Sequence, residues 1–342
     1  MDVIEQTLQV SKCKLLHHFQ VAASTNNLLL YRIEGLQNGE YHQITGILTQ
    51  FNNRCWRVPV YPHEQVDYQK VCDIQQSITK SKAINTPSYF VTKSDSYPKK
   101  KLDVLFDSGT LIAKFTNNAL SHSVVCMHDA DHIKEVISAI ECIEDFLIAD
   151  GHHRFTAYQQ QVNSGIETVR SLPVFITHAS QARVKSFELI CRLTANFNWQ
   201  RFAQYIRQLG LLSCNRSIAD YLITYQNEQL AVAFDSRINR QDDTKRAGYH
   251  FELIIEKLTG FSGIDFISSE ALEFYEENNE ANSQLGSRSH QYLFIKTKSP
   301  SIDTIYQDAI NGYLCPKKST CFLFKPHEDI IDYLQQELRV AS

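Results

Sequence analysis

The chain has 342 residues, of which 21% are charged and 43% are hydrophobic, and its formal charge at pH 7 is −4. These values are typical of a globular protein of about two domains and exclude disorder over the whole length. A duplex-DNA binder needs a basic face, so no nucleic-acid partner is expected. No apolar run reaches the roughly 18 residues that span a bilayer, and the N-terminus lacks the basic start and apolar core of a signal peptide. We therefore expect a soluble, cytoplasmic protein with no membrane partner.

The first half of the chain alternates strand and helix patterns. FLIAD (146–150) is a short apolar run, GHHRFTAYQQQV is typical of the start of a helix, and LPVFITH (172–178) is again a strand pattern. This strand–turn–helix–strand order predicts an α/β domain. The other segments are predicted as strands at 27–34, within 41–60 and at 106–115 behind a turn, as helices at 67–80 and 131–144, and as an exposed loop with solvated lysines at 95–101.

The second half combines amphipathic helix patterns with strand patterns. Helices are predicted at 199–212, at 249–260 and from about 328 to 338, strands at 231–235, 292–297 and 319–326, and a solvated acidic face at 273–280. The expected division is an N-terminal α/β domain, residues 1–185, and a C-terminal α+β domain, residues 186–342. The fold class is thus α/β at the N-terminus and α+β overall.

Nine cysteines are scattered along the chain, with no C-x-x-C pair and no matching histidine pair. A structural zinc site is therefore not predicted. The pattern favours reduced, mostly buried thiols in a reducing compartment.

The segment IADGHHRFTAY (148–158) contains the largest group of neighbouring side chains that can bind ligands or exchange protons. A buried strand leads to Asp150, Gly151 allows a close backbone approach, and His152, His153 and Arg154 gather at the start of a helix. A helix N-terminus attracts anions, and an arginine adds a fork that fits phosphate or carboxylate. Imidazoles exchange protons near neutral pH. These residue types together indicate an anion site with acid–base groups, although a capping aspartate beside buried structural histidines remains the alternative.

Two further clusters are less specific. In VYPHEQV (60–66), Pro62 can start a helix whose first turn would hold His63 and Glu64, and an ordinary helix cap explains this pattern equally well. LCPKKSTCFLF (314–324) has the lysines and hydroxyls of a phosphate-binding loop. It lacks the glycines of a P-loop, which is excluded, and a turn before a strand is an equal alternative.

The motifs PHEQ (62–65) and DGHHR (150–154), in this order, resemble the archaeal free-serine kinases of the ParB/sulfiredoxin-like nucleotide-binding superfamily. The whole chain also resembles the prokaryotic family catalogued as domain of unknown function 1015. The blocks that carry this second resemblance are PHE at 62–64, IADGHHRF at 148–155 and CPKKSTCFLFKP at 315–326. The serine-kinase resemblance covers the N-terminal half, for which it implies a ParB/sulfiredoxin-like fold.

The resemblance implies phosphoryl transfer from ATP or ADP, with Mg²⁺, to a small hydroxyl metabolite such as free L-serine. Glu64 matches the base that deprotonates the acceptor, and Arg154 matches an arginine that contacts phosphate. Glu64, Asp150 and His152 are the expected catalytic residues, and Asp150 is a candidate Mg²⁺ ligand. The expected nucleotide- and phosphate-binding residues are Gly151, His153, Arg154, Lys317, Ser319 and Thr320.

Two other functions remain open on the sequence. A non-kinase, ParB-like switch would bind and slowly hydrolyse a nucleotide without an acceptor. A metal-dependent hydrolase would use Asp150, His152 and His153, but adjacent histidines on a helix point in different directions, which makes joint ligation of one metal awkward. The oligomeric state cannot be read from the sequence.

Overall fold

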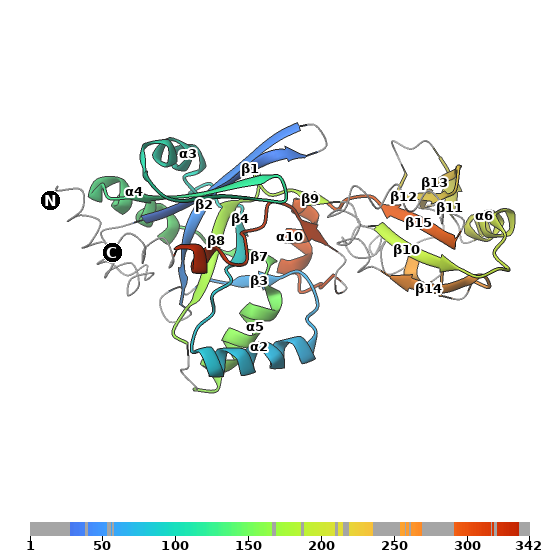
Figure 1. The fold of residues 1–342 in the computed structure, drawn as a ribbon, viewed down its shortest axis with the longest axis horizontal. Helices are drawn as coiled ribbons and strands as arrows, with labels where there is room; N and C mark the ends of the chain where they lie inside the picture. Colours follow the sequence, from blue (N-terminus) through green and yellow to red (C-terminus); the bar gives the residue numbers. More distant parts are fainter. Residues whose placement is uncertain are drawn as a thin grey trace. The chain divides into compact units, whose positions relative to one another are not determined.

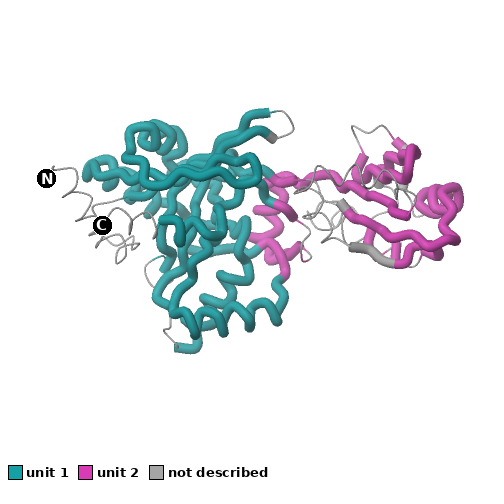
Figure 2. The backbone as a smooth tube through the Cα atoms, viewed as in Figure 1, with its two compact units in different colours: residues 1–62, 66–183, 322–342 teal, residues 63–65, 184–321 magenta. Residues whose placement is uncertain are grey.

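The computed structural model divides the chain into two compact units, which Figure 2 distinguishes by colour. Unit 1 comprises residues 1–62, 66–183 and 322–342, and unit 2 comprises residues 63–65 and 184–321. The structure describes residues 28–37, 40–52, 56, 58–165, 169–185, 188–208, 211–214, 219–234, 254–256, 258–259, 261–268, 291–315, 317 and 320–334.

Unit 1 is built on a mixed eight-stranded sheet, whose strand order is β3-β7-β4-β8-β2-β1-β6-β5 (Figure 1). Its strands are β1 (Leu28–Gln37), β2 (Glu40–Phe51), β3 (Val60–Pro62), β4 (Ser88–Thr92), β5 (Thr110–Asn117), β6 (Leu120–Met127), β7 (Phe146–Asp150) and β8 (Leu172–His178). β3 runs parallel to β7, and β4 runs parallel to β8 but antiparallel to β7. The predicted α/β class is confirmed.

The helices of unit 1 begin at residues that suit helix starts. α2 (Tyr68–Ser81) and α4 (Ala130–Glu141) are capped by Asp67 and Asp129, whose carboxylates accept backbone N–H groups of the first turn. α3 (Lys99–Ser108) follows Pro98, and α5 (His152–Asn163) follows Gly151.

One face of the sheet forms the main core with the apolar sides of α3, α4 and α5. Alternate strand residues point into it, among them Leu30, Ile47, Phe90, Ile148 and Ile176, all fully buried. α2 packs on α5 through a smaller cluster around Val71, Ile78 and Ala157. This arrangement fixes the end of β7 and the start of α5 against a rigid core.

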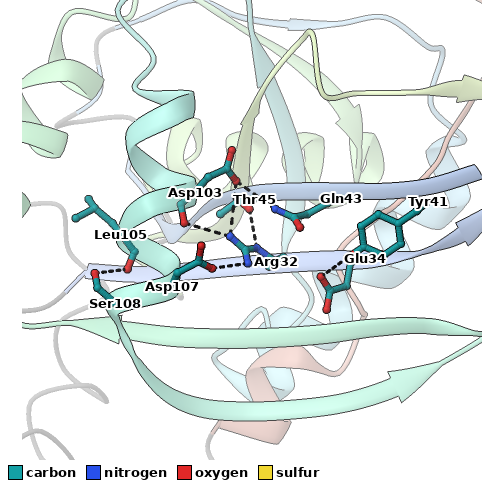
Figure 3. A network of polar contacts seen from close by, with 9 residues as sticks. All are labelled: Arg32, Glu34, Tyr41, Gln43, Thr45, Asp103, Leu105, Asp107 and Ser108. Atoms are coloured by element: carbon teal, nitrogen blue, oxygen red, sulfur yellow. Dashed lines mark hydrogen bonds and ion pairs between the residues drawn. The ribbon is translucent and has the colours of Figure 1, made fainter.

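Arg32 of β1 ties α3 to the sheet. Its guanidinium donates to Asp107 Oδ1 at 2.7 Å, to Thr45 Oγ1 at 3.0 Å and to the Asp103 carbonyl at 3.2 Å (Figure 3). It also lies over the Phe106 ring. A half-buried guanidinium with several acceptors and an aromatic face holds its helix in one orientation.

The opposite face of the sheet is crossed by the C-terminal segment of unit 1. Phe322 packs on Tyr89, and the backbone N–H of His327 donates to the Tyr31 hydroxyl at 3.1 Å. The Tyr31 hydroxyl also forms a hydrogen bond with His122 Nδ1, which lies 2.7 Å away. His122 is 3% exposed, and burial followed by the nearby His327 lowers its pKa to about 4.

This contact predicts acid sensitivity. Because the folded pKa of His122 lies below its unfolded value of about 6.5, the unfolded state binds more protons between pH 4 and 6.5. The free energy of unfolding is therefore expected to fall as the pH is lowered through this range, by at most about 3 kcal/mol from His122. Urea unfolding of wild type and His122→Gln between pH 4.5 and 7.5 tests this. The variant should lose much of the slope, and the exposed-site control His132→Gln should keep it. Equal slopes for wild type and His122→Gln would contradict the prediction.

Unit 2 contains a six-stranded sheet with the order β11-β13-β12-β15-β10-β14. The strands are β10 (Glu188–Leu193), β11 (Leu211–Ser213), β12 (Tyr221–Tyr225), β13 (Glu228–Phe234), β14 (Ile264–Ser268) and β15 (Tyr292–Thr297). α6 (Trp199–Gln208) packs Phe202 and Ile206 into the core of this sheet, and α10 (Ile302–Ile310) begins after a Ser301 cap. β9 (Val184–Lys185) opens the unit, and β16 (Cys321–Phe322) lies where the chain returns to unit 1.

The division differs from residues 1–185 and 186–342 in three places. Unit 2 already includes Val184 and Lys185. Residues 63–65 belong to unit 2, because their backbone bonds to Cys315, and residues 322–342 belong to unit 1, because Phe322 and His327 contact its sheet.

Five local predictions are wrong. Residues 106–108 are the end of α3 rather than the start of the strand predicted at 106–115, which begins at Thr110 as β5. Lys99, Lys100 and Lys101 form the first turn of α3 rather than a loop, since Pro98 starts a helix there. Residues 63–65 are not helical, because Glu64 pairs as an isolated strand residue and α2 begins only at Tyr68. The strand expected at 319–326 is reduced to β16, since Phe324 takes a left-handed φ of 55°. Residues 211–212 belong to β11 rather than to a helix.

Several predictions fall partly or wholly on residues outside the described part of the chain. They are the acidic face at 273–280, most of the helix at 249–260 and the end of the C-terminal helix.

Cys72, Cys126, Cys142, Cys191 and Cys214 are free thiols. Burial raises the pKa of Cys126 and of Cys191 to about 12, so neither is a thiolate near neutral pH. Among the described helices, none has both the length and the hydropathy that crossing a bilayer requires.

Candidate functional site

The end of β7 and the start of α5 form the first part of the candidate site. Asp150 is the last residue of β7, and Gly151 turns the chain into α5 with φ of 90°. A Cβ at Gly151 would lie 2.5 Å from Ser88 Oγ and 2.8 Å from an Arg154 nitrogen. Glycine is therefore required both for the left-handed backbone and for the close approach of Ser88 and Arg154.

Asp150 is held between two cations. Lys325 Nζ lies 2.9 Å from Asp150 Oδ1, and an Arg154 terminal nitrogen lies 3.0 Å from Oδ2. Burial alone would raise the pKa of Asp150, but Lys325 and Arg154 outweigh it and hold the pKa well below its usual range. The carboxylate is therefore ionised at all physiological pH values, and the three side chains together carry one net positive charge.

Arg154 is positioned by the protein before any ligand arrives. Its terminal nitrogen also donates to the Pro87 carbonyl at 3.0 Å, which fixes the guanidinium beside the N-terminus of α5. Its Nε–H is enclosed by protein and has no hydrogen-bond partner. A buried donor without an acceptor is costly, so this Nε–H is an unsatisfied group inside the cluster.

The two histidines occupy different surroundings. His152 is 7% exposed, and its proximity contributes to the low pKa of Asp150. His153 Nε2 accepts the backbone N–H of Asp67 at 2.8 Å, which ties the start of α5 to the start of α2. This nitrogen of His153 is thus an acceptor in a structural contact.

A second cluster lies in unit 2 around Glu64. The His63 carbonyl accepts the Cys315 N–H at 2.7 Å, and the Gln65 N–H donates to the Cys315 carbonyl at 2.9 Å. Thr320 Oγ1 donates to Glu64 Oε2 at 3.0 Å and lies 2.6 Å from Nε2 of the buried His63. Because the Thr320 proton goes to the carboxylate, His63 Nε2 is the donor to Thr320. The structure thus brings the PHE and CPKKST blocks together.

The other predicted residues are placed as follows. Lys317 is exposed, and Ser319 lies outside the described residues. Glu64 belongs to unit 2 and Asp150 to unit 1, so their meeting in one site stays a prediction.

Two side chains of these clusters were not identified from the sequence. Lys325 lies within the third motif block, yet no local pattern links it to Asp150, which is 175 residues away. His63 lies inside the PHE block, and its burial against Thr320 depends on a contact across 257 residues. Both residues lie in the motif blocks that carry the family resemblance, and those blocks are the sequence signal from which they could have been identified.

The side chains around Asp150 offer few donor atoms to a metal ion. Within the described ranges, no group of three His, Cys, Asp or Glu side chains could hold a metal. Asp150 offers one carboxylate, and both of its oxygens already bind cationic side chains. A Mg²⁺ ion is commonly held by one or two carboxylates together with substrate phosphates, so Asp150 fits such an ion only if it exchanges Lys325 or Arg154 for the metal.

The comparison with protein families agrees with the motif blocks. Residues 19–176 match the family described as "Protein of unknown function (DUF1015)". The predicted resemblance to this family is thereby confirmed over residues 19–176. The DUF1015 match contains the PHE and IADGHHRF blocks and ends within β8. No curated protein matches the chain.

Three solved structures are similar to this chain. C-terminally truncated SbnI from Staphylococcus aureus is 12% identical with a TM-score of 0.46, and the alignment covers 86% of this chain and 96% of SbnI. A free serine kinase in complex with AMP is 12% identical with a TM-score of 0.39, covering 81% and 87%. A conserved hypothetical protein from Pyrococcus furiosus is 13% identical with a TM-score of 0.37, covering 81% and 90%.

Proposed function

We propose that this protein is a small-molecule kinase that transfers a phosphoryl group from ATP or ADP to a hydroxyl of a small metabolite such as free L-serine. The observation that carries the proposal is the cluster at the N-terminus of α5, where Arg154 and Lys325 flank Asp150. The cluster has a net positive charge and lies at a helix end that favours anions.

The nucleotide phosphates would bind at the start of α5. Gly151 has no side chain to block a close approach to the backbone, and Arg154, which Asp150 and the Pro87 carbonyl hold beside the start of α5, would contact a phosphate oxygen. Positively charged side chains that the protein holds in place before the reaction stabilise the negative charge that develops on a phosphoryl group during its transfer. When bound, Mg²⁺ would neutralise phosphate charge, with Asp150 as its protein ligand.

The acceptor would be activated by Glu64. In the proposed step the acceptor hydroxyl gives its proton to Glu64, its oxygen bonds to phosphorus, and the bond from phosphorus to the nucleotide oxygen breaks. Thr320 donates to one Glu64 oxygen and is itself held by His63, which restricts the orientation of the carboxylate. The likeness of PHEQ and DGHHR to the free-serine kinases supports the same pair of roles.

The test is phosphorus NMR of the purified chain with Mg²⁺, ATP or ADP, and a pool of hydroxyl metabolites that includes L-serine. A new phosphomonoester signal that depends on one acceptor is the expected result, and it identifies donor and acceptor together. Nucleotide hydrolysis at a rate that does not depend on the acceptor would overturn the kinase proposal in favour of a nucleotide-hydrolysing switch protein. No reaction and no line broadening of either nucleotide would overturn nucleotide binding altogether.

A further inference from the structure

Each carboxylate oxygen of Asp150 holds a cationic side chain. Lys325 Nζ lies 2.9 Å from Oδ1, and an Arg154 terminal nitrogen lies 3.0 Å from Oδ2. A divalent cation such as Mg²⁺ binds carboxylate oxygens directly, so it can bind Asp150 only where one of these side chains gives way. Lys325 and Arg154 differ in exposure and in their other contacts, and this difference indicates which of them does so.

Arg154 is fixed beside Asp150 by contacts on two sides. It lies one turn after Asp150 on α5, and the nitrogen that contacts the carboxylate also donates to the Pro87 carbonyl at 3.0 Å. The same nitrogen would lie 2.8 Å from a Cβ at Gly151, so it fills the space that the glycine leaves. Only 23% of the Arg154 side chain is exposed. Arg154 therefore stays in place when a ligand arrives.

Lys325 is able to leave the carboxylate. Its side chain is 40% exposed, and its ammonium group ends a flexible four-carbon stem, so it can turn away without a movement of the backbone. The backbone on either side is held to unit 1. The Leu323 N–H donates to the Arg183 carbonyl at 2.9 Å, and the His327 N–H donates to the Tyr31 hydroxyl at 3.1 Å. Lys325 would thus remain within the reach of one lysine side chain from the start of α5.

The charges favour replacement of Lys325 by another cation. Burial raises the pKa of Asp150, and among the groups that lower it Lys325 acts most strongly, ahead of Arg154. Loss of Lys325 alone would leave a half-buried carboxylate with less compensation, whereas a divalent cation in its place restores it. With the ammonium group still nearby, the cluster would then carry more positive charge, which suits the polyphosphate of a nucleotide.

We infer that Lys325 is an exchangeable partner of Asp150, which holds the carboxylate when no metal is bound and moves to the nucleotide phosphates when a divalent cation takes Oδ1. This inference rests on the proposed function, because it uses the nucleotide site at the start of α5. It gives a role in phosphate binding to Lys325, which is not among the nucleotide-binding residues expected from the sequence.

The first test follows the Gly151 amide by NMR during titration with Mn²⁺, a paramagnetic ion that broadens the signals of nearby atoms. The sequence has 12 glycines, and Asp-Gly occurs only at 150–151, so labelling with carbonyl-¹³C aspartate and ¹⁵N glycine selects the Gly151 signal. Lys325→Met should lower the Mn²⁺ concentration that half-broadens this signal at least about fivefold. The ion then displaces no ammonium group and meets one positive charge fewer.

Two further variants serve as controls for this titration. Lys134→Met, the same change at an exposed lysine of α4, should give the wild-type concentration. Lys325→Arg keeps a positive charge on Asp150 and should not lower the concentration. Urea unfolding shows whether each variant remains folded. An unchanged or higher Mn²⁺ concentration in folded Lys325→Met would overturn the exchange.

The second test is calorimetric titration with ATP and ADP in the presence of Mg²⁺. Lys325→Met should raise the Kd of at least one nucleotide at least about fivefold, because a charge-assisted contact to phosphate is lost. Metal and nucleotide affinities should thus change in opposite directions, which a purely structural role of Lys325 does not produce. An unchanged Kd would overturn the phosphate contact. Wild type that binds neither nucleotide would overturn the proposed function and the phosphate contact together, while the Mn²⁺ titration would still decide the exchange.

Discussion

Glu64→Gln is expected to lower kcat for phosphoryl transfer by about 10²- to 10⁴-fold, the usual contribution of a general base, and to leave nucleotide affinity unchanged. Glutamine keeps the shape of glutamate and still accepts the hydrogen bond that Thr320 donates at 3.0 Å. It cannot take a proton from the acceptor hydroxyl. The loss would therefore report base chemistry rather than packing.

The measurement is initial-rate kinetics with the acceptor found by phosphorus NMR, together with calorimetric titration of the nucleotide. Glu141→Gln, the same change at an exposed glutamate at the end of α4, serves as the control and should keep wild-type rates. Wild-type turnover in Glu64→Gln would remove Glu64 from the mechanism. Loss of nucleotide affinity in that variant would assign Glu64 to binding instead of proton transfer.

Arg154→Gln is expected to raise the nucleotide Kd by about ten- to a hundredfold. A hydrogen bond to a charged group contributes roughly 1.5–3 kcal/mol, and each 1.4 kcal/mol is a factor of ten in Kd. The substitution also removes one of the two cations on Asp150, so Lys325 alone would neutralise that carboxylate. Both effects make the start of α5 less attractive to phosphate.

Titration calorimetry with ATP and ADP measures this effect, and urea unfolding shows whether the variant remains folded. Arg201→Gln, at an exposed position of α6, is the matched control. Arg154→Lys separates charge from shape, because lysine keeps the positive charge but not the planar fork, and it should bind more weakly than wild type. A folded Arg154→Gln variant with wild-type Kd would exclude Arg154 from nucleotide binding.

The elements that position the first cluster could be predicted because their signals are local. The first four residues of FLIAD are apolar, as a strand buried on both faces must be, and the Gly151 that follows Asp150 marks the left-handed turn into α5. The helices at 67–80 and 131–144 were equally visible, since their apolar residues recur at helical spacing and their caps are aspartates. The sequence by itself thus determined the α/β class, and it predicted an anion site at the start of α5.

Local sequence patterns gave wrong secondary-structure predictions where long-range contacts determine the backbone conformation. Residues 63–65 follow a proline that can start a helix, yet their pairing with Cys315 keeps them extended. The CFLF run has strand propensity throughout, yet Phe324 turns into the left-handed region as the segment crosses the sheet. In both places tertiary hydrogen bonds and packing outweigh propensities of a few tenths of a kcal/mol per residue.

Only the tertiary structure decided which partners complete the two clusters. Lys325 reaches Asp150 across 175 residues, and Thr320 reaches Glu64 across 256 residues. Such pairs cannot be predicted from composition or residue spacing, because strand order and register determine which distant segments of the chain lie side by side. The sequence determined which acidic, basic and hydroxyl residues the two clusters contain. The fold determined the protonation state of Asp150, the direction of the hydrogen bonds to Glu64 and the orientation of these side chains.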